Sequence, residues 1–173
     1  MDMDINVNSR RAAFAIGLAL LVCADAGATP HERIVCSIVA ALDYQIPANI
    51  VLAVAEIENG KPGHASKNAN GTLDFGPMQF NTVYLAELRG KYGITERDVS
   101  DKGCYPYQLA AWRLRGHIVN DTWGDMWTRA ANYHSYTPEY NSIYRAKLIR
   151  SADKWANWLS ARFKTRDVLN SKD

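Results

Sequence analysis

The sequence has little net charge and no run of basic residues. Its 20 Lys and Arg residues nearly balance its 18 Asp and Glu residues, which leaves a formal charge of +2. Domains that bind nucleic acid usually gather Lys and Arg into a patch. The sequence therefore argues against a nucleic-acid partner. Its pI of 8.4 is compatible with an anionic polymer as partner but does not demand one.

The motifs of metal, nucleotide and nucleophile chemistry are also missing. The four histidines show no ligand spacing, and the sequence has no Cys-x-x-Cys pair, phosphate loop or nucleophile elbow. It contains no internal repeat or low-complexity segment. We therefore expect no metal and no cofactor. The length of 173 residues suits one domain with a sizeable core, and we expect a monomer.

Only three cysteines are present, and one of them, Cys23, lies in an apolar N-terminal segment. Two arginines precede the apolar run of residues 12–23, which is too short for a comfortable membrane span. Small residues follow it. We interpret residues 1–28 as a signal peptide that is cleaved after Ala28, which predicts a periplasmic protein. The alternative is an uncleaved N-terminal anchor.

Removal of that segment leaves Cys36 and Cys104 as an even pair. In an exported protein, such a pair suggests one disulfide bond. The bond would tie the first helix of the mature protein to the loop before a later helix, and it would close a long loop of chain. Two buried free thiols are the alternative.

Apolar periodicity predicts an all-α domain over residues 29–163. Helices are expected near residues 32–42, 47–58, 82–91, 94–100, 107–119, 123–133 and 138–163. The polar stretch between the second and third of these contains Asn70-Gly71, which indicates a turn, so we expect one long irregular loop or a small hairpin there. Residues 164–173 are expected to form a polar tail.

Glu58 is the leading candidate for a catalytic acid. The helix before it is apolar around much of its girth and should be buried, and Gly60 and Pro62 are expected to end it. The negative end of the helix dipole and apolar neighbours both disfavour ionisation there, and a raised pKa suits a general acid. Glu56 is the rival, on the opposite face of the helix. The alternative for either residue is a solvated surface carboxylate.

A short turn downstream offers groups that could bind a sugar. Residues 74–80 read DFGPMQF, in which Gly76 allows close approach of a chain or ligand. The amide of Gln79 can donate and accept hydrogen bonds to sugar hydroxyls. The alternative is a turn that is packed by Met78 and its aromatic neighbours.

Aromatic residues gather in the C-terminal half of the chain. Tyrosines offer an apolar face and a hydroxyl to a sugar groove, with partly buried packing as the alternative. The candidates are Tyr133, Tyr136, Tyr140 and Tyr144. The tryptophan pairs are spaced three or four residues apart, which favours core positions over sugar stacking. These pairs are Trp123 with Trp127 and Trp155 with Trp158.

These elements together resemble the soluble lytic transglycosylase family, which has a lysozyme-like helical fold. The family places its acid at a helix end, as Glu58 is placed here, and its Gly-Leu-Met-Gln element resembles the Gly-Pro-Met-Gln of residues 76–79. The tyrosine of the family's Ala-Tyr-Asn element falls on Tyr133. A later tyrosine of the family's groove falls on Tyr140, with Tyr144 as the second choice.

The details are most similar to the TrbN-type proteins of conjugal DNA-transfer systems, in the segments YGIT, CYPYQLAAWRLRGHI and RAANYH. The resemblance implies a glycan-cleaving lyase that cuts peptidoglycan between N-acetylmuramic acid and N-acetylglucosamine and leaves a 1,6-anhydro ring. Glu58 would act first as acid and then as base. Gln79 and Tyr140 would position the sugar, and Tyr133 would wall the cleft. The substrate-binding residues that the resemblance implies also include Gly76, Met78 and Tyr144. The implied partners are components of a conjugation or type IV secretion apparatus.

Two other functions remain open. Ordinary glycosidases use two carboxylates that flank the scissile bond, and Asp74 is the one convincing second carboxylate. The first alternative is therefore a hydrolytic, goose-type-like lysozyme that uses Glu58 with Asp74. The second is a non-catalytic assembly module with a lysozyme-like fold, against which the intact pair of Glu58 and Gln79 argues.

Overall fold

The computed structural model describes residues 30–165. The predicted signal peptide, residues 1–28, and residues 166–173 of the predicted tail lie outside the described residues. The elements are α1 (Pro30–Asp43), α2 (Ala48–Glu58), β1 (Ala65–Lys67), β2 (Leu73–Phe75), β3 (Phe80–Asn81), α3 (Thr82–Tyr92), α4 (Glu96–Ser100), α5 (Tyr105–Asn120), α6 (Met126–Ala131) and α7 (Pro138–Ser160). This mostly helical chain confirms the all-α fold class and is consistent with a lysozyme-like fold. Among the helices of residues 30–165, none is long and apolar enough to cross a bilayer.

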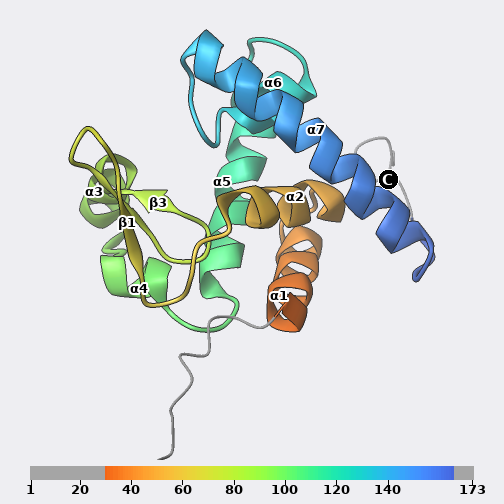
Figure 1. The fold of residues 1–173 in the computed structure, drawn as a ribbon, viewed down its shortest axis with the longest axis horizontal. Helices are drawn as coiled ribbons and strands as arrows, with labels where there is room; N and C mark the ends of the chain where they lie inside the picture. The colour runs from red at the N-terminus through yellow and green to blue at the C-terminus, as the bar shows by residue number, and fades with distance from the viewer. Residues whose placement is uncertain (1–29, 166–173) are drawn as a thin grey trace, which may run out of the picture.

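The helices and the small sheet lie around α5. Figure 1 shows the strands, α3 and α4 on one side of α5, and α1, α2 and α7 on the other. Helix α2 packs most extensively against α7 and also contacts α1 and α5, while α6 packs against α7. The core is therefore centred on α2.

Helix α2 is buried because almost all of its residues are apolar. Residues 50–55 are fully buried, as expected for a helix that neighbours cover on every side. The helix ends at Glu58, and Asn59 takes the left-handed C-cap conformation with a φ of 46°. The expectation that Gly60 and Pro62 end the helix is thus corrected, because asparagine also tolerates this conformation.

The polar segment after α2 forms the expected small hairpin around Asn70-Gly71. Strands β1 and β2 pair antiparallel, with Ala65 opposite Phe75, and β3 adds a third strand with Phe80 opposite Phe75. Strand β3 has two residues, which is too short for a periodic pattern to indicate. The sheet places Asp74 in its central strand.

Two helix ends differ by three residues from the sequence expectation, more than any other. Helix α6 begins at Met126 rather than at residue 123, because the Asp125 carboxylate accepts a hydrogen bond from the third backbone N–H of the helix and caps it. Helix α7 ends at Ser160 rather than at residue 163. Both differences are local and leave the order of the elements unchanged.

The tryptophans divide between core and surface. Trp127 and Trp155 are partly buried and pack against the core, as their spacing predicts. Trp123 is 60% exposed in the loop before α6, so the expected core position is wrong for this residue. A spacing of four residues predicts a shared face only when both residues belong to one helix.

The expected disulfide bond between Cys36 and Cys104 is present. It links α1 to the N-cap residue of α5, and the two cysteines are 68 residues apart in the sequence. The bond therefore encloses α2, the sheet, α3 and α4 in one covalent loop, which restricts the unfolded chain.

Replacement of both Cys36 and Cys104 by serine should lower the free energy of unfolding by about 4 kcal/mol, because a loop of this length loses much closure entropy in the unfolded state. Urea denaturation of the oxidised wild type and of the double variant measures the change. A reducing agent should affect only the wild type. Equal denaturation midpoints for the two proteins would contradict the prediction.

Candidate functional site

Glu58 is the last residue of α2 and is partly buried at the edge of the core. Its Oε1 atom accepts a hydrogen bond from the Tyr144 hydroxyl at 2.6 Å. Tyr144 belongs to α7, so the dense packing of α2 against α7 brings the two side chains together. The second oxygen of Glu58 has no hydrogen bond to another described residue.

The pKa of Glu58 is raised to about 7, mainly because burial disfavours the charged form. The negative charge of Asp74 raises it further. The Tyr144 hydrogen bond and the charges of Arg113 and Lys147 act in the opposite direction. A carboxyl group with this pKa is partly protonated near neutral pH, which is what a general acid requires.

The surroundings of Tyr144 keep its hydroxyl protonated, so that it can donate a hydrogen bond to Glu58. Its side chain is buried, and burial together with the Glu58 carboxylate raises the pKa of its hydroxyl well above the usual value. The His134 ring stacks on the Tyr144 ring at 4.7 Å between centroids. Burial lowers the pKa of His134, which favours the neutral ring at this position.

Glu56, the rival carboxylate, lies in a different environment. Its pKa is lowered: burial acts to raise it, but hydrogen bonds from Lys154, Ser151 and Trp155 and the Lys154 charge outweigh that effect. Glu56 therefore anchors α2 to α7 as an ionised group. It is poorly suited to donate a proton near neutral pH.

The turn of residues 76–79 lies directly against the end of α2. A Cβ atom on Gly60 would overlap the carbonyl oxygen of Gly76 and the side chain of Gln79. Gly76 has a φ of 68°, and a Cβ atom there would overlap the carbonyl oxygen of Val99. Glycine is thus required at both positions for this close approach.

Gln79 has an unusual backbone conformation for a non-glycine residue, with a φ of 51°. Its side-chain Nε2 donates to the Gly76 carbonyl at 2.9 Å, which closes the turn on itself. Its amide oxygen receives no hydrogen bond from another described residue. Such left-handed residues often occur at functional sites, where the surrounding structure holds them in place.

The other predicted substrate-binding residues occupy different environments. Met78 is fully buried in the core, and its carbonyl accepts a hydrogen bond from the buried Tyr133 hydroxyl at 2.7 Å. Tyr133 thus ties the chain after α6 to the turn of residues 76–79. Tyr140 is 56% exposed and makes no hydrogen bond to Glu58, whereas Tyr144, the second choice, donates one to it.

Asp74 is ordered by two amides. Asn81 donates to its Oδ1 at 2.7 Å, and Asn68 donates to its Oδ2 at 2.9 Å. The carboxylate therefore holds the sheet together, and its charge also acts on Glu58. Each oxygen keeps a further lone pair for another donor.

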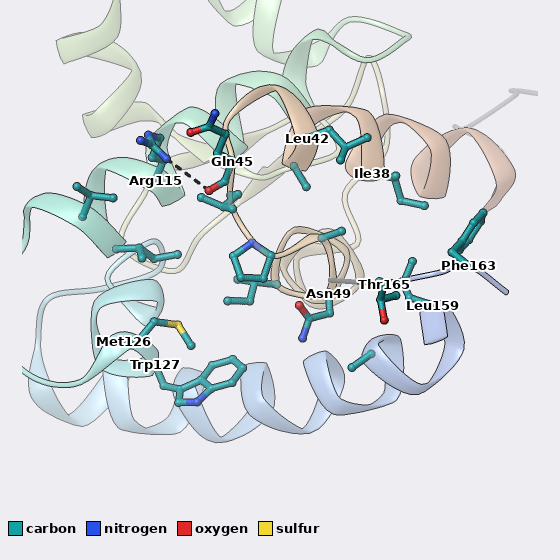
Figure 2. Close-up of a pocket in the computed structure, with 18 of the residues that line it drawn as sticks. Ile38, Leu42, Gln45, Asn49, Arg115, Met126, Trp127, Leu159, Phe163 and Thr165 are labelled. Atoms are coloured by element: carbon teal, nitrogen blue, oxygen red, sulfur yellow. Dashed lines mark hydrogen bonds between the residues drawn. The ribbon is translucent and has the colours of Figure 1, made fainter. Parts of the chain in front are cut away.

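Two cavities in the described part of the chain lie away from Glu58. One, of about 930 Å³, is lined mainly by apolar side chains from α1, α2, α6 and the end of α7. Figure 2 shows Trp127, Met126 and Phe163 around it, and the Arg115 guanidinium bonded to the Gln45 carbonyl. No carboxylate lines this cavity, so it offers no acid for catalysis.

Arg113 and His134 are neighbours of the site that sequence reasoning missed. The Arg113 guanidinium lies over the Tyr133 ring at 4.6 Å, and the His134 ring stacks on Tyr144. No local pattern marks Arg113 among the basic residues of α5. Within residues 30–165, no group of three His, Cys, Asp or Glu side chains could hold a metal ion.

Removal of the Tyr144 hydroxyl should raise the pKa of Glu58 by about one unit, because the lost hydrogen bond stabilises the charged form. The pKa can be measured by carbon NMR of the Glu58 carboxyl group, with Glu58→Gln to assign the signal. Tyr140→Phe, on the same helix, is the matched control and should change nothing. An unchanged pKa in Tyr144→Phe would contradict the prediction.

Glu58 should also make stability depend on pH. Its pKa rises from an ordinary 4.5 to about 7 on folding, so the unfolded chain loses this proton first as the pH increases. Its protonation therefore favours the folded state most below pH 4.5, and this stability is lost as the pH passes through about 7. Glu58→Gln cannot ionise, so its free energy of unfolding should rise relative to that of wild type as the pH increases across that range, by up to about 3 kcal/mol. Denaturation of both proteins at acid and alkaline pH tests this, and parallel pH profiles would refute it.

Comparison with known proteins finds relatives in Salmonella and Shigella. The invasion protein IagB of Salmonella typhimurium is 24% identical over 133 residues, which cover 75% of this chain and 78% of IagB. Protein IpgF is 29% identical in Shigella flexneri and 30% identical in Shigella sonnei, over 105 residues that cover 60% of this chain and 67% of IpgF. No protein-family model matches the chain. These relatives support the lytic transglycosylase resemblance at the level of the family, and the chain belongs to the same protein family as IpgF.

Proposed function

We propose that this protein is a peptidoglycan lytic transglycosylase that cleaves the β-1,4 bond between N-acetylmuramic acid and N-acetylglucosamine. The observation that carries the proposal is the state of Glu58, whose pKa is raised to about 7. The acid lies at a helix end, beside a glycine-containing turn with a free amide oxygen on Gln79. The relation to IagB and IpgF supports the family-level assignment.

In the first step, Glu58 donates its proton to the oxygen of the scissile glycosidic bond. The Tyr144 hydroxyl donates to Oε1, so the acidic proton resides on Oε2, the oxygen that Tyr144 leaves open. As the bond breaks, the leaving sugar takes the proton and Glu58 becomes a carboxylate. The Tyr144 hydrogen bond then stabilises that charge.

In the second step, Glu58 acts as the base. It removes the proton of the muramic 6-hydroxyl, and the resulting oxygen attacks C1 of the same sugar, which closes the 1,6-anhydro ring. Glu58 is then protonated again, and no water is consumed. A group with a pKa near the working pH can both give and take a proton, which suits this cycle.

A hydrolytic, goose-type-like lysozyme is the second candidate, and the position of Asp74 favours it. The charge of Asp74 acts on Glu58, which makes it the natural second carboxylate. In that mechanism Asp74 would activate a water molecule or stabilise the developing positive charge. The asparagines that bind both of its oxygens assign it equally well to ordering the hairpin.

The cellular setting is part of the same proposal. A signal peptide over residues 1–28 would export the enzyme to the periplasm, where peptidoglycan lies. The resemblance to TrbN-type proteins suggests that it opens the wall for a conjugation or type IV secretion apparatus, whose components would be its partners. A non-catalytic assembly module in such an apparatus is the alternative.

Digestion of purified peptidoglycan by the mature protein, followed by mass spectrometry, tests this function. Wild type should release anhydro-muropeptides, and Glu58→Gln should reduce the rate by at least about a thousandfold, because the acid is essential for departure of the leaving group. Glu56→Gln is the matched control on the same helix and should remain active.

Other products would distinguish the alternatives. Reducing ends in place of anhydro ends would identify a hydrolytic lysozyme, and loss of activity in Asp74→Asn would then implicate the second carboxylate. Cleavage that survives Glu58→Gln would refute the acid assignment. No products from any variant, with wall binding retained, would favour the assembly module.

A further inference from the structure

A second cavity, of about 610 Å³, lies between α3, α5 and the loop that joins α6 to α7. Aromatic side chains form much of its lining. They are Tyr44, Tyr84, Trp112 and Tyr136. Aromatic faces combined with a few polar groups are typical of pockets that bind sugars and similar ligands.

Arg113 contributes an unpaired positive charge to this cavity. Its guanidinium lies over the Tyr84 ring at 3.9 Å and over the Tyr133 ring at 4.6 Å. The buried Nε atom has no hydrogen-bond partner, and the ion pairs between described residues do not include Arg113. Its charge is thus held by aromatic faces rather than by a carboxylate.

The two carboxylates that line the cavity already have partners. Glu87 forms an ion pair with Lys91 at 2.7 Å on the surface of α3. Asp121 accepts a hydrogen bond from the Asn132 side chain at 2.7 Å. Neither of them is within ion-pair distance of Arg113.

The other basic groups of the lining are also occupied or neutral. Arg115 donates to the backbone carbonyl of Tyr44 at 3.0 Å. His117 contacts Asp121 and the Tyr136 hydroxyl through Nδ1, and burial lowers its pKa, which favours the neutral ring. The open cation of the cavity is therefore Arg113.

Tyr133 connects this cavity to the candidate site. One face of its ring meets Arg113, and its hydroxyl bonds to the Met78 carbonyl in the turn beside Glu58. The charge of Arg113 is also close enough to act on the carboxyl of Glu58. A glycan that is bound at Glu58 could thus extend a side group toward Arg113.

We propose that Arg113 binds a carboxylate of the glycan substrate, with the group that carries it packed against Tyr84 and Tyr136. This inference rests on the proposed function. In a peptidoglycan strand the carboxylate has two sources: the lactyl group of muramic acid without a peptide, or the peptide stem. Guanidinium groups suit either source, because they bind carboxylates with two parallel hydrogen bonds.

Calorimetric binding to proteins that carry Glu58→Gln tests the inference without cleavage of the ligand. Arg113→Gln removes the charge, Arg113→Lys keeps it, and Arg150→Gln, at an exposed position on α7 outside the cavity, is the matched control. The ligands are a neutral N-acetylglucosamine oligomer, a peptide-free glycan fragment, and peptide-bearing fragments with free or amidated carboxylates. Thermal unfolding checks that each variant is folded.

We expect Arg113→Gln to weaken binding of carboxylate-bearing fragments about tenfold or more, with little change for the neutral oligomer. Arg113→Lys should retain much of the affinity, and Arg150→Gln all of it. Amidation of the ligand should reproduce the loss with Arg113 intact. If Arg113→Gln weakens binding of the peptide-free fragment, the carboxylate is that of the lactyl group. If it weakens binding of the peptide-bearing fragments alone, the carboxylate belongs to the stem.

Equal losses of affinity for charged and neutral ligands would overturn the role of Arg113 while glycan binding stood. So would an affinity that neither Arg113→Gln nor amidation of the ligand reduces. No binding of any fragment by any protein would overturn both this inference and the proposed function. Arg113-dependent binding by a protein whose wild type yields no anhydro products would support the inference and refute the transglycosylase.

Discussion

The burial of α2 is the constraint on which the candidate site depends. Residues 50–55 are apolar and fully buried among α1, α5 and α7, so the helix has a fixed position and its last residue has a fixed exit from the core. Glu58 occupies that exit, where the helix dipole and the desolvated surroundings both oppose its ionisation. The unfavourable environment of one carboxyl group is tolerated because the apolar helix behind it stabilises the fold far more.

Three segments that are distant in the sequence meet at the end of this helix, and each is attached by a specific contact. Tyr144 bonds to Glu58 from α7, and Tyr133 bonds from the chain after α6 to the Met78 carbonyl. The absence of a side chain at Gly60 lets the turn of residues 76–79 touch the helix end. The groups of the site are therefore positioned by the same packing that forms the core.

The sequence predicts the parts of this arrangement that depend on local pattern. Periodicity finds the helices, and export with an even cysteine count finds the bond between Cys36 and Cys104. The sequence pattern does not rank Tyr140 against Tyr144, because the two residues share a helix face. In the structure Tyr144 lies opposite the end of α2, whereas Tyr140 lies one turn away from Tyr144 and is exposed. The orientation of Arg113 over Tyr133 likewise depends on how α5 packs, which no local pattern contains.

The environment of Glu58 bears on the choice between one and two catalytic carboxylates. An inverting hydrolase divides the work between two residues, so its acid is best kept protonated while a second carboxylate stays ionised. An acid that must also serve as base needs both forms to be accessible, and a pKa of about 7 provides this near neutral pH. Asp74 helps to set that value through its charge while its oxygens hold the amides of Asn68 and Asn81. One residue can thus carry out the proton transfers, with the second carboxylate acting on it from a distance.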